Sequence, residues 1–88
     1  MPTEAEQVFI ETSANMGVVT AVRGSIVDVT FDVSIPAIHN VIYAQNRTIT
    51  LEVVSQLSSK KVRTIALTPT QGLARGMPAE DMGQPLRV

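Results

Sequence analysis

Short runs rich in β-branched residues, separated by turn residues every ~8–12 positions, constrain this chain more than any other feature. The stretch GVVTAVRGSIVDVTF (17–31) is representative, because Val27, Val29 and Phe31 share one face of its period-2 alternation. Such alternation is typical of strands that bury one face. Long amphipathic helical stretches do not interrupt these runs. The sequence therefore predicts an all-β fold.

The expected strands alternate with turns along most of the chain. We expect Gly24 to bend one ribbon around a barrel corner, Asn46 and Arg47 to form a tight turn, and Lys60–Lys61 to lie at a hairpin tip. Residues 70–85 are expected to be a loop, because they contain three glycines and two prolines. The expected strands cover residues 17–31 with the break at Gly24, 41–45, 48–57, 61–68 and 86–88, and the apolar triplet 8–10 is expected to add an edge strand.

A length of 88 residues allows one domain, and a small closed barrel is the expected architecture because closure removes exposed strand edges. We divide the chain into a flexible N-terminal segment (1–15) and a barrel domain (16–88). The net charge of −1 excludes a strongly basic surface. Because the chain has no cysteine, disulfide bonds and metal sites with thiolate ligands are excluded as well. Residues 1–16 contain three glutamates and no Lys or Arg, so we expect no targeting peptide and a cytosolic protein, unless a partner carries it to a membrane.

The string TPTQGLARG (68–76) contains the ingredients of a phosphate-binding loop. A Walker A loop needs a Lys followed by Ser or Thr directly after its second glycine, whereas Met77 and Pro78 follow Gly76 here. Pro78 also lacks an amide that a phosphate cradle would use. We therefore predict that Gly72 and Gly76 permit backbone turns and bind no nucleotide.

Other candidate sites are equally weak in this sequence. His39 is the single histidine, and Glu80 and Asp81 are expected to be solvated loop charges, so we predict no catalytic, cofactor-binding or metal-binding residue. An OB-like barrel that binds single-stranded nucleic acid is the alternative hypothesis, but it requires clustered cations and exposed aromatic rings. The arginines are interspersed with acids, and the aromatic residues number three: Phe9, Phe31 and Tyr43.

Several strings resemble one family in order and spacing. The chain is similar to the N-terminal domain of the catalytic beta subunit of F-type ATP synthases. The strings that carry the similarity are GVVTAVRGSIVDVTF, IPAIHN, LEVVSQL, VRTIALTPTQGLARGM and GQPLRV. The resemblance covers about residues 16–88, and residues 62–76 are its most specific part. The related barrel of the alpha subunit is a poorer match.

The resemblance implies a six-stranded barrel that packs against alpha-subunit N-terminal barrels in an alternating hexameric ring and is monomeric or weakly self-associating alone. Apolar residues on both strand faces, such as Val18/Val19 and Val53/Val54, suit such packing. The resemblance also implies a peripheral position on the cytoplasmic side of the bacterial inner membrane, without direct contact with membrane or nucleic acid. In the family, the residues that bind ATP or ADP with Mg²⁺ lie downstream, so no cofactor is expected in this chain.

Three positions depart from the usual family pattern. Gln56 and Ser58 stand where the family usually has His and Gly, and Met82 stands where it has Thr. These departures indicate a divergent branch, among the alternative bacterial ATPases that can move Na⁺ instead of H⁺. The sequence leaves both coupling ions open.

Overall fold

The computed structural model of this chain describes residues 15–85, and every regular element in that range is a strand. None of the described residues forms a helix with the length and apolar character that crossing a bilayer would require. The strands are β2 (Asn15–Arg23), β3 (Ile26–Phe31), β4 (Asn40–Ala44), β5 (Ile49–Gln56), β6 (Lys61–Ala66) and β7 (Pro78–Pro85).

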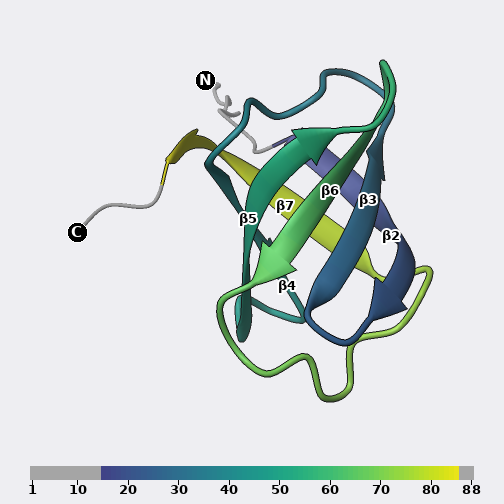
Figure 1. Ribbon diagram of the computed structural model, residues 1–88, viewed down its shortest axis with the longest axis vertical. Helices are drawn as coiled ribbons and strands as arrows, with labels where there is room; N and C mark the ends of the chain where they lie inside the picture. Colours follow the sequence, from purple (N-terminus) through teal and green to yellow (C-terminus); the bar gives the residue numbers. More distant parts are fainter. Residues whose placement is uncertain (1–14, 86–88) are drawn as a thin grey trace, which may run out of the picture.

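The six strands close into one antiparallel barrel in the order β2-β3-β6-β5-β4-β7 (Figure 1). Each strand therefore has a hydrogen-bonded neighbour on both sides, and the described barrel has no free edge. In Figure 1, β7 passes behind β5 and β6 and links β2 to β4. The predicted all-β, six-stranded closed barrel is confirmed.

Alternating side chains from all six strands fill the barrel interior, as expected for a barrel too narrow to enclose a channel. On β5 the inward residues are Ile49, Leu51 and Val53, as the sequence predicts. Thr64 is fully buried among them, and its hydroxyl donates to the Val27 carbonyl at 2.7 Å, which satisfies its polar group. The main buried apolar residues are Val19, Val27, Val29, Phe31, Ile42, Ala44, Ile49, Leu51, Val53, Val62, Leu73 and Ala79.

Two β-bulges change which side chains point outward. Thr20 is the extra residue of β2 opposite β3, and Val54 is the extra residue of β5 opposite β6. A bulge kinks its strand and interrupts the strict alternation of faces. Val18 and Val54 are exposed by more than two fifths because they alternate with the buried Val19 and Val53, and the bulges pair the next residues, Ala21 and Ser55, with the outward-facing Asp28 and Arg63.

The structure corrects the expected bend at Gly24. Gly24 and Ser25 form the two-residue turn of a hairpin, because Arg23 pairs with Ile26 and β2 runs antiparallel to β3. The φ of Gly24 is 60°, as the first loop residue of a type II′ turn requires. The ribbon therefore folds back on itself at this glycine instead of continuing around a corner.

The turn expected at Asn46 and Arg47 is confirmed, and it is more unusual than the sequence indicates. Gln45, Asn46 and Arg47 all have positive φ, at 52°, 56° and 68°. Each such residue costs roughly 1–2 kcal/mol in L-amino acids, although asparagine tolerates the region better. Thr48 holds the turn, with its amide (3.1 Å) and its hydroxyl (2.6 Å) both donating to the Gln45 carbonyl.

The largest error of the sequence analysis concerns residues 70–85. Their second half is the strand β7, whose Ala79 and Asp81 point inward. The prolines at its first and last positions and the glycine at 83 gave this stretch the composition of a loop. The predicted strand at 86–88 and the predicted edge strand at 8–10 lie outside the described residues. At the hairpin tip predicted for Lys60–Lys61, Lys60 is in the turn, but Lys61 already begins β6.

Candidate functional site

The TPTQGLARG segment connects β6 to β7 across one end of the barrel, at the bottom of Figure 1. Gly72 and Gly76 have φ values of 88° and 95°, and each closes a turn. The prediction that these glycines serve backbone turns is confirmed.

The loop's polar groups bind the barrel itself. The Gly76 amide donates to the Val19 carbonyl at 2.8 Å, and the Thr70 hydroxyl donates to the Gly24 carbonyl at 3.1 Å. The Leu73 amide donates within the loop to Thr70 at 2.9 Å, and the Leu73 side chain is buried in the core cluster. The loop therefore acts as a plug for this end of the barrel, and these two amides are not directed at a ligand.

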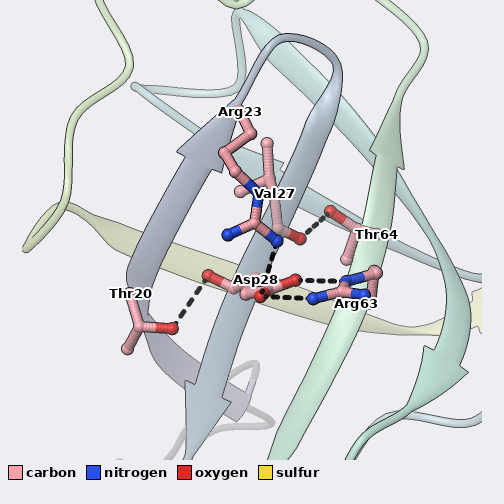
Figure 2. A network of polar contacts seen from close by, with 6 residues as sticks. All are labelled: Thr20, Arg23, Val27, Asp28, Arg63 and Thr64. Carbon is pink, nitrogen blue, oxygen red and sulfur yellow. Dashed lines mark hydrogen bonds and ion pairs between the residues drawn. The ribbon is translucent and has the colours of Figure 1, made fainter.

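Asp28 organises a polar network on the outside of β2, β3 and β6 (Figure 2). Arg63, its register partner on β6, donates through Nε at 2.9 Å and Nη2 at 3.1 Å to the two carboxylate oxygens. Arg23 lies 4.0 Å from the same carboxylate, and the hydroxyl of the bulge residue Thr20 donates to the Asp28 carbonyl at 3.2 Å. The charge of the Asp28 carboxylate is tolerated at this covered position because the carboxylate is paired with a cation and hydrogen-bonded.

The two hydrogen bonds from Arg63 hold the pKa of Asp28 below its usual value, and the charges of Arg63, Arg23 and Lys61 lower it further. Burial acts in the opposite direction but does not overcome them. The Asp28 carboxylate is therefore ionised at neutral pH and engaged in structure, which makes it a poor proton acceptor for catalysis.

A second polar cluster lies across β2, β7 and β4. Met16, Glu80 and Tyr43 face one another in register on the outer face of these strands. Arg47 donates to both Glu80 oxygens at 3.2 and 3.3 Å, and its guanidinium lies 5.7 Å from the centre of the Tyr43 ring. Sequence reasoning missed this cluster, because it read residues 70–85 as a loop and so placed Glu80 beside no strand.

The expectation for Glu80 and Asp81 is wrong. Neither residue is in a loop, since both belong to β7, and Asp81 is buried with 7% exposure. One Asp81 oxygen accepts the Gly83 amide at 2.9 Å. Adjacent residues of a strand point to opposite faces, so Glu80 reaches the outer cluster while Asp81 turns inward.

His39 is in the loop before β4, where its Nδ1 lies 3.1 Å from a carboxylate oxygen of Glu52. Within residues 15–85, no three His, Asp or Glu side chains gather closely enough to hold a metal ion. Of the aromatic residues in that range, Phe31 is 1% exposed and belongs to the core, which leaves Tyr43 alone as an outer ring. A series of stacking platforms for nucleic-acid bases is therefore not assembled on the described surface.

These features define a small closed barrel in which Arg47 and Arg63 pair with acids and whose loop plugs one end. Residues 19–83 match the family model described as the ATP synthase alpha/beta family, beta-barrel domain. ATP synthase subunit beta 1 of Pseudoalteromonas atlantica is 62% identical over 82 residues, which make up 93% of this chain and 15% of that protein. ATP synthase subunit beta 2 of Polaromonas naphthalenivorans is 56% identical over 74 residues, or 84% of this chain and 16% of that protein.

The chain belongs to this family, as the N-terminal barrel domain of the beta-subunit type. The resemblance found in the sequence is thereby confirmed. A more distant relative, ATP synthase subunit beta 1 of Chlorobaculum tepidum, is 47% identical over 73 residues, which are 82% of this chain. The chain spans only 15–16% of the length of these curated relatives.

Proposed function

We propose that this barrel is a structural interaction domain, which packs against neighbouring alpha- and beta-subunit barrels and holds them in an alternating hexameric ring. Its membership of the ATP synthase alpha/beta family supports the proposal. Several large apolar side chains exposed on the outer surface also support it.

One observation carries the proposal: a group of exposed apolar side chains on and beside β5. Val54 occupies the β5 bulge, Leu57 follows the end of β5, and Ile38 adjoins His39, whose amide donates to the Val53 carbonyl at 2.8 Å. We call Ile38, Val54 and Leu57 the β5 patch, and each is exposed by 41–43%. Grouped apolar side chains on the surface of a small domain mark interaction sites, because their burial against a partner is favourable at about 25 cal/mol per Å².

The parent subunit has a wider role in this proposal. It performs rotary ATP synthesis and hydrolysis coupled to transport of H⁺ or Na⁺, as a peripheral subunit on the cytoplasmic side of the bacterial inner membrane. ATP or ADP with Mg²⁺ binds in other parts of that subunit, and the barrel carries no cofactor. The names of the relatives and the small share of their length that this chain spans support this division of labour.

Isothermal titration calorimetry of this chain against the N-terminal barrel of the matching alpha subunit tests the proposal. We expect saturable binding with a Kd in the micromolar range, weakened by about tenfold or more in Val54→Asp, since burying an unpaired carboxylate costs more than 1.4 kcal/mol. Leu67→Asp is the matched control, because Leu67 is similarly exposed but lies outside the β5 patch, at the start of the 67–77 loop. Absence of binding at several hundred micromolar, or equal weakening by both variants, would overturn the proposal.

A further inference from the structure

An open groove of about 570 Å³ lies on the outer face of β7, between the start of β2 and the end of β4. Its walls include Met16, Tyr43, Arg47, Met77, Pro78 and Glu80. We call it the β7 groove. Met16 is exposed by 53%, and the strained turn with three left-handed residues forms one rim. The β7 groove is thus a mainly apolar hollow with one paired cation.

The chain itself supplies a segment of suitable position and length. Residues 1–14, outside the described structure, lead directly into Asn15, and the next residue, Met16, is a wall of the β7 groove. Ile10, the nearer end of the apolar triplet 8–10, is five residues before Asn15, and five extended residues span up to roughly 17 Å. Ile10 can therefore lie up to roughly 17 Å from Asn15, the residue that precedes the groove wall Met16.

Closure of the barrel decides how the triplet can contact the fold. Each described strand pairs with two neighbours, and the β2 side of β7 is unpaired only along residues 82–85, so residues 8–10 find no long free edge to which they could add as a strand. Their apolar side chains can still contact the outer surface, and the β7 groove is the apolar hollow beside the point where the segment joins β2.

Arg47 also offers this occupant hydrogen-bond donors, while its charge is balanced by Glu80. Residues 1–14 contain Glu4, Glu6 and Glu11 and no Lys or Arg, and the last two glutamates flank the triplet. Arg47 is 59% exposed and uses Nε and Nη2 to bind Glu80. A guanidinium carries five N–H donors, so Arg47 has the capacity to bind a second carboxylate from the segment.

We propose that Val8–Ile10 of this chain dock in the β7 groove, with the Phe9 ring against the Met16 and Met77 side chains and a flanking glutamate on Arg47. Thioether sulfurs make favourable contacts with aromatic rings, and the two methionines supply them here. This docking involves residues other than the proposed contact at the β5 patch, since none of Ile38, Val54 and Leu57 lines the groove.

Methyl NMR of the whole 88-residue chain with ¹³C-methyl methionine tests the docking, because the four methionines give few, assignable signals. We expect Phe9→Ala to shift the Met16 and Met77 methyl resonances, because the ring current of Phe9 is removed. Met82 is an internal control, since it belongs to β7 but does not line the groove. Gln7→Ala is the matched control variant and is expected to leave Met16 and Met77 unchanged. Contacts between the Phe9 ring and these two methyl groups in a nuclear Overhauser spectrum are the second readout.

Two outcomes would overturn the docking. Unmoved Met16 and Met77 resonances in Phe9→Ala, without Overhauser contacts to Phe9, would show that the triplet lies elsewhere. Shifts of these methyl groups that grow with protein concentration, or that arise only on addition of the alpha-subunit barrel, would assign the groove to a second copy or to that neighbour. Neither result bears on Val54, so failure here leaves the calorimetric test of the proposed function intact.

Discussion

Asp28 shows how a single residue ties the β2–β3 hairpin to β6, a strand distant in sequence. It accepts two hydrogen bonds from Arg63 of β6, and its backbone carbonyl accepts the hydroxyl of Thr20 of β2. The pKa of Asp28 is lowered, chiefly by the Arg63 hydrogen bonds. A carboxyl whose pKa is lower in the folded state stabilises the fold above its unfolded pKa, and this contribution disappears as pH falls through the folded pKa.

We expect Asp28→Asn to lower the free energy of unfolding by about 1 kcal/mol at pH 7, since the bidentate pair is lost but Arg63 remains partly solvated. The difference from wild type should begin to narrow below about pH 4, where the Asp28 carboxyl of the unfolded chain takes up its proton, and should narrow further as pH falls through the lowered folded pKa. Urea denaturation at pH 7 and at pH 3 measures this difference in the free energy of unfolding. Asp32→Asn in the exposed 32–39 loop is the control. A gap of equal size at both pH values would contradict this account of Asp28.

At the scale of elements, the loop at residues 67–77 matters because it plugs one end of the barrel. Leu73→Ala should lower the free energy of unfolding by about 2 kcal/mol, because Leu73 is buried in the core cluster. Leu67→Ala makes the same change in the same loop at a side chain that is 46% exposed, and we expect a change within about 0.5 kcal/mol. Thermal and urea unfolding of both variants measure the contrast. Equal losses would show that Leu73 does not plug the barrel.

The elements differ in how far the sequence could predict them. β3 and β5 were predictable, because Val27, Val29 and Phe31, and likewise Ile49 and Leu51, alternate at period 2. β7 was not, because two prolines and a glycine give it the composition of a loop, and it is a strand because β2 and β4 pair with it from both sides. The polar clusters were equally hidden. The Asp28–Arg63 contact joins residues 35 apart, and the Arg47–Glu80 contact depends on the unpredicted strand.

At the scale of the whole molecule, the outer surface carries two apolar regions that share no residue, the β5 patch and the β7 groove. Of the three patch residues Val54 belongs to β5, and β5 pairs with β4, which lines the groove. A contact between different faces of successive subunits builds a ring when the rotation closes. Val54 is exposed because it alternates with the buried Val53, and at the bulge it has no register partner on β6, so in the proposed assembly this position presents an apolar side chain to a neighbour.

Thiol footprinting tests this central claim most directly. The chain has no cysteine, so V54C and S25C each introduce one unique thiol, the first in the β5 patch and the second in the exposed β2–β3 turn. With the alpha-subunit barrel at ten times its Kd, we predict that maleimide modification of the V54C thiol slows about tenfold, because only the small unbound fraction reacts, while that of the S25C thiol is unchanged. Equal rates for V54C with and without the bound partner would show that the barrels associate through another face and would contradict the account.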